Sequence, residues 1–199
     1  VQKCMISGNL FKNIAGSAIL IGIFSKEDQE VHLPYIPEEE REICKDNTIQ
    51  NNYISDVAQE DYGCVGIGYG YTEATIIQNN EICFLPWTGI HCGWGWTTRH
   101  SAAKDNIIRS NHVHHIMQLL IDGAAIYTLS CQPGTIIEKN YLHSIHKSEI
   151  ANWRPDNDST GVYLDCPAIY IDEGSGGMTV RDNLVEDIDP DAEILHYNK

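Results

Sequence analysis

The segment Ile77-Gln-Asn-Asn80-Glu-Ile82-Cys-Phe-Leu85 decides the fold, because its pattern recurs six times along the 199-residue chain. Each copy has an apolar residue three positions before an asparagine, and further apolar residues two and five positions after it. A pattern that returns every 28 to 43 residues predicts a solenoid, built from stacked repeats. The six asparagines are Asn9, Asn52, Asn80, Asn111, Asn140 and Asn183.

Two solenoid classes share the fragment apolar-x-x-Asn-x-apolar. Leucine-rich repeats also need an apolar residue five positions before the asparagine, and they run to only ~20–29 residues. Here that position is mostly polar, as at Asn47, Thr75 and Asn106. The apolar residues of the repeat are mainly Ile and Val, which favour strands. We therefore predict an all-β fold, a right-handed parallel β-helix of about six coils, whose asparagines occupy left-handed corners and form an amide ladder.

The spacing of the repeats also predicts the domain organisation. One β-helix domain spans residues 1–199, and the two longest intervals predict loop insertions at about 25–46 and 146–160. Neither end carries a polar capping element, so we expect a monomeric segment of a longer chain.

Composition excludes several classes of partner. With 13 Lys and Arg against 28 Asp and Glu, the net charge of −15 argues against binding a nucleic-acid backbone or an anionic membrane surface. No apolar stretch approaches the ~18 residues that span a bilayer. The seven cysteines form no C-x-x-C pair, and their odd number leaves at least one unpaired; we expect small buried thiols rather than a disulfide framework.

A tryptophan-rich run, Thr88-Gly-Ile-His-Cys-Gly-Trp-Gly-Trp96, is the first candidate binding feature. If the run is a strand, Trp94 and Trp96 lie on the same face, where indole rings can pack against the C–H faces of sugars. The alternative is that the rings pack under a neighbouring loop.

Two aspartates are the candidate catalytic residues. If Ile169 and Ile171 point inward, alternation places Tyr170 and Asp172 outward, one coil from Asp122, and two such carboxyl groups can cleave a glycosidic bond as acid and as base or nucleophile. Glu173 is an alternate, although alternation turns it inward or into the turn. Either aspartate can instead be a turn former.

Metal binding has less support in the sequence. His114, His143 and Glu186 occupy the same slot of successive repeats and offer ligand atoms, but such a column is more often a solvated or hydrogen-bonded ladder. A catalytic Ca²⁺ needs clustered aspartates beside a basic residue, and no Asp cluster accompanies the arginines. We therefore expect no cofactor and no metal ligand, with Ca²⁺ as the minor alternative.

Three runs together resemble the right-handed parallel β-helix glycosidases of the pectate-lyase-like superfamily, and most closely glycoside hydrolase family 141. They are Gly89-Ile-His-Cys-Gly-Trp-Gly-Trp96, Asp122-Gly-Ala-Ala-Ile-Tyr-Thr128 and Ile169-Tyr-Ile-Asp-Glu-Gly-Ser175, within a resemblance covering roughly residues 47–188. The resemblance implies that Asp122 and Asp172 form the catalytic pair. Two departures are Ala124 in place of a glycine, and a partial duplicate, Gly161-Val-Tyr-Leu-Asp-Cys-Pro167, which makes Asp165 a further alternate.

The resulting functional prediction is an extracellular or periplasmic glycoside hydrolase, fucosidase- or xylanase-like, acting on a plant-type or other complex polysaccharide. Its only expected partner is the carbohydrate substrate. Two alternatives stay open, a non-catalytic carbohydrate-binding or adhesin-type β-helix and a Ca²⁺-dependent polysaccharide lyase. The residues predicted to bind substrate are His91, Trp94, Trp96, Tyr127, Tyr170, Trp153 and Arg154.

Overall fold

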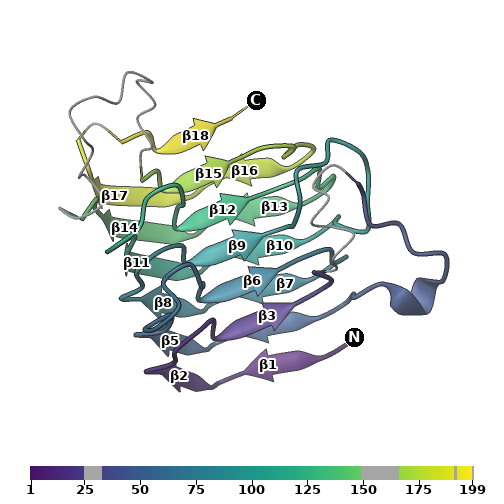
Figure 1. Ribbon diagram of the computed structural model, residues 1–199, viewed down its shortest axis with the longest axis horizontal. Coiled ribbons are helices and arrows are strands. Elements are labelled where there is room, and N and C mark those ends of the chain that lie inside the picture. The colour runs from purple at the N-terminus through teal and green to yellow at the C-terminus, as the bar shows by residue number, and fades with distance from the viewer. Residues whose placement is uncertain (25–32, 149–165, 191, 199) are drawn as a thin grey trace.

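The computed structural model describes residues 1–24, 33–148, 166–190 and 192–198, and it is a stack of coils (Figure 1). Each coil contributes one strand to each of three parallel six-stranded sheets. The first sheet contains β1 (Met5–Ser7), β4 (Thr48–Gln50), β7 (Ile76–Gln78), β10 (Ile107–Arg109), β13 (Ile136–Glu138) and β16 (Thr179–Arg181). The second contains β2 (Leu10–Lys12), β5 (Tyr53–Ser55), β8 (Glu81–Cys83), β11 (His112–Ile116), β14 (Tyr141–Ile145) and β17 (Leu184–Ile188). The third contains β3 (Ile19–Ile21), β6 (Ile67–Tyr69), β9 (Ile90–Cys92), β12 (Ile126–Thr128), β15 (Ile169–Ile171) and β18 (Leu195–Tyr197).

The strands pair in the register that the repeat predicts. Ile77 of β7 faces Ile49 and Ile108 in the neighbouring coils, and Ile82 of β8 faces Ile54 and Val113. Equivalent repeat positions therefore stack on one another from coil to coil, and the predicted parallel β-helix of about six coils is confirmed.

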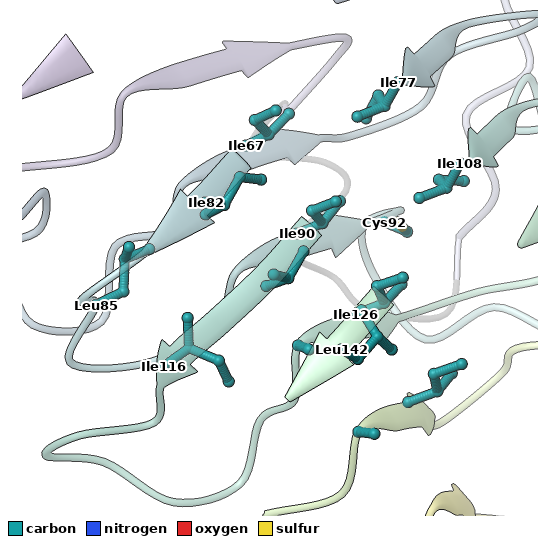
Figure 2. Close-up of a cluster of buried hydrophobic side chains, with 14 of the residues drawn as sticks. Ile67, Ile77, Ile82, Leu85, Ile90, Cys92, Ile108, Ile116, Ile126 and Leu142 are labelled. Carbon is teal, nitrogen blue, oxygen red and sulfur yellow. The ribbon is translucent and has the colours of Figure 1, made fainter. Parts of the chain in front are cut away.

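The repeated apolar residues fill the interior of the coils. One continuous core runs through the stack, because a single coil cannot bury its inner face without neighbours (Figure 2). The labelled core side chains are Ile67, Ile77, Ile82, Leu85, Ile90, Cys92, Ile108, Ile116, Ile126 and Leu142.

The recurring asparagines form the predicted amide ladder. Asn80 Oδ1 accepts hydrogen bonds from the backbone N–H and the side-chain Nδ2 of Asn52, at 3.1 and 2.9 Å. Asn80 in turn donates to Asn111 Oδ1 and to the carbonyl of Ile49, both at 3.0 Å. The same bonds recur from Asn9 to Asn183, so each buried amide satisfies backbone groups that the turn between two sheets leaves unpaired.

The left-handed corners fall one residue earlier than predicted. The positive φ belongs to the residue before each ladder asparagine, for example Asn79 (φ +55°) before Asn80. The ladder asparagines themselves are absent from the positive-φ residues of the described chain, because their role is to bridge coils through the side-chain amide. The corner residues are Gly8, Asn51, Asn79, Ser110, Lys139 and Asp182.

The predicted insertions are only partly described. Residues 33–46 of the first insertion contain a short 3₁₀ helix, η2 (Glu40–Glu42), and only residues 146–148 of the second belong to the described chain. Among the described residues no disulfide joins any of the seven cysteines, and Cys44, Cys83, Cys92 and Cys166 are buried, as expected for core thiols. Among the described residues there is no helix with the length and apolarity to cross a membrane.

Candidate functional site

A column of aromatic side chains crosses the outer face of the third sheet. His91, Tyr127, Tyr170 and His196 occupy the same register position in β9, β12, β15 and β18. The ring centroids of Tyr127 lie 5.2 Å from those of both His91 and Tyr170, and His196 lies 4.7 Å beyond Tyr170. The alternating residues point the other way, because Ile126, Ile169 and Ile171 belong to the core.

Asp172 lies beside this column, directly after β15, where its backbone N–H still bonds to the carbonyl of Thr128. Its carboxylate accepts a short hydrogen bond from the phenol of Tyr127 and one of 2.9 Å from Asn198 Nδ2. Only 7% of the residue is exposed. These bonds hold both carboxylate oxygens on the outer side of the sheet, as the alternation predicted.

Asp122 approaches the same column from the loop before β12. The residue is exposed and has a φ of +62°. The indole Nε1 of Trp87 donates to the backbone carbonyls of Ile121 and Asp122, at 3.1 and 3.2 Å. Gly123 is required here, because a Cβ at this position would lie 2.4 Å from Trp87 Nε1 and 2.5 Å from Thr88 Oγ1. The loop that carries Asp122 is thereby held against the coil below.

The two aspartates interact electrostatically. Partial desolvation of the Asp122 carboxyl group raises its pKa, and the negative charges of Asp172 and Glu173 raise it further, whereas His196 acts in the opposite direction. The pKa values of Tyr127 and Tyr170 are also raised, chiefly by burial and then by the neighbouring carboxylates, so both phenols stay protonated. Burial lowers the pKa of His91 to about 4, so its ring is neutral at pH 7.

The prediction that Trp94 and Trp96 share one strand face is wrong. Strand β9 ends at Cys92. Gly93 and Gly95 both have positive φ angles, so the chain changes direction before Trp94 and again before Trp96. Trp94 packs edge-on against Phe24, with ring centroids 5.2 Å apart, and also lies 6.4 Å from His91. Trp96 is 42% exposed.

Trp94 nevertheless borders the aromatic column. Its indole Nε1 is buried and has no hydrogen-bond partner among the described residues. Such an unsatisfied donor beside His91 is a group that a bound hydroxyl can satisfy.

The remaining predicted residues separate into two groups. Glu173 is exposed in the turn after Asp172, and its backbone carbonyl accepts a hydrogen bond from Ser130. Asp165, Trp153 and Arg154 lie outside the described residues.

Sequence reasoning missed three residues of the site. Trp87 directly precedes the tryptophan-rich run and was not predicted as a site residue, yet it holds the Asp122 loop, and its ring lies 6.0 Å from that of Tyr127. His196 and Asn198 follow the last copy of the repeat, where the pattern gives no register. Both could have been found by extending the register of the third sheet by one coil, which places His196 opposite Tyr170 and Asn198 beside Asp172.

The arrangement combines two carboxyl groups in different environments with a row of rings on the outer side of the third sheet, of which His91, Tyr127 and Tyr170 are largely buried. One carboxyl group is hydrogen-bonded through both oxygens, and the other is partly desolvated near a like charge. Two surface pockets, of about 270 Å³ beside Ala102 and about 300 Å³ beside Lys45, contain neither aspartate.

Comparisons with known proteins give one informative relative. Neither protein-family profiles nor the curated proteins yield a match. A solved structure described as a glycoside hydrolase superposes with a TM-score of 0.84 at 35% sequence identity. The alignment covers 99% of this chain but only 32% of that one, so this chain spans about a third of the length of its relative. That description gives no family number, and the resemblance to family 141 stays a prediction.

Proposed function

We propose that this chain forms the catalytic β-helix of a glycoside hydrolase, in which Asp122 is the general acid and Asp172 is the base or nucleophile. The observation that carries the proposal is that the carboxyl groups of Asp122 and Asp172 interact electrostatically beside the aromatic column of His91, Tyr127, Tyr170 and His196. The similarity to a glycoside hydrolase at 35% identity supports the same reaction class.

The different surroundings of the two carboxyl groups support the assignment of roles. A general acid has to hold its proton near the working pH, and the raised pKa of Asp122 favours this. A base or nucleophile has to be an oriented anion, and the bonds from Tyr127 and Asn198 fix the Asp172 carboxylate in one orientation. Glycosidases of both stereochemical outcomes use such a pair.

The surface around the pair and the net charge of the chain support a proposal for the substrate class. Aromatic rings offer flat apolar faces for the C–H faces of sugars, and the net charge of −15 favours a neutral glycan over a polyanion. We propose a plant-type or other complex polysaccharide, cleaved in a fucosidase- or xylanase-like reaction outside the cytoplasm.

The aromatic column by itself also suits a non-catalytic carbohydrate-binding module. A lyase receives less support. It needs a basic residue beside the carboxyl groups, and the two arginines on described strands bind other side chains. Arg109 on β10 bonds to Gln78, and Arg181 on β16 pairs with Glu138, all on the first sheet.

The deciding experiment measures hydrolysis by the wild type and by the isosteric variants Asp122→Asn and Asp172→Asn. Reducing-end release from a panel of plant polysaccharides and release of nitrophenol from aryl glycosides provide the readouts. We expect each variant to lose at least ~10³-fold in kcat/KM, a loss within the range attributed to acid–base and covalent catalysis. Asp61→Asn is the control, because Asp61 is exposed and is not part of the candidate site, and it should keep full activity.

The outcomes separate the alternatives. Loss of hydrolysis with retained glycan binding in both variants supports the hydrolase. Binding by the wild type without any cleavage identifies a binding module. Activity that EDTA abolishes and that yields unsaturated uronate products identifies a lyase.

A further inference from the structure

Histidines gather on the outer face of the second sheet, on a different sheet from Asp122 and Asp172. His112 and His114 lie on β11, and Glu81 lies on the adjacent β8, paired in register with His112. Each of the three offers one ligand atom, and these atoms all lie within 4.8 Å of one another. No other group of this kind occurs among the described residues.

His114 carries a buried nitrogen that no protein group satisfies. Its Nδ1 is 2.7 Å from His115 Nδ1, so one of the two rings donates a proton to the other. Its Nε2 is buried, has no hydrogen-bond partner in the described chain, and lies 3.5 Å from Glu81 Oε1. When His114 Nδ1 is the donor, Nε2 presents a bare lone pair toward the Glu81 carboxylate, an arrangement that a cation between them stabilises.

His112 is held in the same way by the next coil. Its Nε2 lies 2.8 Å from His143 Nε2, and His143 is itself fixed by Ser144 Oγ at 2.9 Å from its Nδ1. One ring nitrogen of His112 is therefore engaged by a histidine, which leaves Nδ1 for another ligand. Metal-binding histidines commonly have their second nitrogen fixed by such an outer partner.

The distances suit a tetrahedral ion of the zinc class. Ligand bonds of ~2.0–2.2 Å place neighbouring ligand atoms about 3.4 Å apart around a tetrahedral ion. The 3.5 Å between His114 Nε2 and Glu81 Oε1 already matches this edge, and the 4.8 Å limit on the set requires a shift of about 1.4 Å at most. Two imidazoles with one carboxylate select Zn²⁺ over Ca²⁺ or Mg²⁺, which prefer all-oxygen sites.

We propose that Glu81, His112 and His114 bind one divalent transition-metal ion, with Zn²⁺ as the reference ion, and that a water molecule completes the coordination. The ion links β8 to β11 and so joins two successive coils of the stack. Phe84, with its ring 5.9 Å from that of His114 and 5.0 Å from that of His115, covers one side of the site. The sequence suggested a hydrogen-bonded column of His114, His143 and Glu186. In this proposal His114 binds the ion instead, and Glu186 accepts a hydrogen bond from Tyr141.

The test is calorimetric titration of ZnCl₂ into the chelator-treated chain, with Co²⁺ absorption as a second readout. We expect one Zn²⁺ per chain, an increase in the thermal unfolding midpoint on binding, and the intense visible bands of tetrahedral Co²⁺. Glu81→Gln, His112→Gln and His114→Gln should each weaken binding by at least ~100-fold, and His115→Ala, which removes only an outer partner, by ~10–100-fold. Glu60→Gln and His100→Gln, at exposed positions, are the matched controls and should bind as the wild type does.

Glu81→Gln keeps the shape of a partly exposed side chain, so its fold, checked by circular dichroism, should be intact. The proposal is overturned if the wild type binds no Zn²⁺, if folded Glu81→Gln binds as tightly as the wild type, or if the two control variants lose binding as well.

Discussion

The phenol of Tyr127 donates a hydrogen bond to the carboxylate of Asp172, which lies 45 residues later in the sequence and one coil further along the stack. Register alone brings them together, because β12 and β15 pair with Tyr127 opposite Tyr170, and Asp172 follows two residues later. The candidate site therefore depends on the correct stacking of coils.

Replacing Tyr127 with Phe tests this relationship. The ring stays, but Asp172 is left with the bond from Asn198, and loss of a hydrogen bond to a buried charged group costs about 1.5–3 kcal/mol. We expect that decrease in the free energy of unfolding and at least a ~10-fold decrease in kcat. Tyr141→Phe removes a similar phenol–carboxylate bond, to Glu186, at a solvent-exposed position of the second sheet and should change neither quantity appreciably. Equal effects of the two substitutions would contradict the special position of Tyr127.

Glu173→Gln tests the electrostatic coupling around Asp122. The negative charge of Glu173 helps to raise the pKa of Asp122, so its removal lowers that pKa. Because a general acid loses activity as pH rises through its pKa, the alkaline limb of the kcat/KM profile should shift to lower pH while the maximal rate stays near that of the wild type. An inactive Glu173→Gln enzyme would instead make Glu173 the catalytic residue.

Gly123→Ala tests the support of the Asp122 loop. The added methyl group collides with the indole of Trp87 and with Thr88 Oγ1, and overpacking of this kind costs about 1–3 kcal/mol. We expect a lower kcat with little change in the binding of substrate, measured by steady-state kinetics. Gly63→Ala is the control, because its Cβ meets nothing within 4 Å, and it should leave stability and activity unchanged.

The architecture was predictable because the residues of the repeat occupy equivalent positions in successive coils and pair with one another there. The residues three before and two after each asparagine became the inward positions of the first and second sheets, as for Ile77 and Ile82. The outward placement of Tyr170 followed from the alternation around Ile169 and Ile171 in the same way.

Local chain direction was harder to predict. Gly93 and Gly95 end the strand character after Cys92, so period-two alternation does not extend to Trp94 and Trp96. The side chains that support the aspartates, Trp87 and Asn198, act across coils, and their role depends on loop conformation that no repeat encodes.

His91→Phe tests the buried neutral histidine of the aromatic column. Its pKa is lowered from 6.5 to about 4 in the folded state, so between these values the unfolded chain binds the extra proton. The free energy of unfolding is therefore not reduced by His91 above pH 6.5, and it decreases as the pH falls from 6.5 toward 4. Between pH 7 and 4.5 the wild type should lose about 2–3 kcal/mol more than His91→Phe in urea unfolding. The same acid dependence in both proteins would contradict the burial of a neutral ring.

Asn80→Ala compared with Asn79→Gly separates the ladder from the corner. Removing the Asn80 amide leaves the backbone N–H of Asn52 and the carbonyl of Ile49 without partners inside the stack, at a cost of about 1–3 kcal/mol for each buried group. Asn79 is exposed with a φ of +55°, a conformation that glycine adopts freely, so Asn79→Gly should change the free energy of unfolding by only a few tenths of a kcal/mol. Urea unfolding should therefore show a much lower midpoint for Asn80→Ala with an unchanged slope. A larger effect at Asn79 would mean that the corner, rather than the amide ladder, holds successive coils in register.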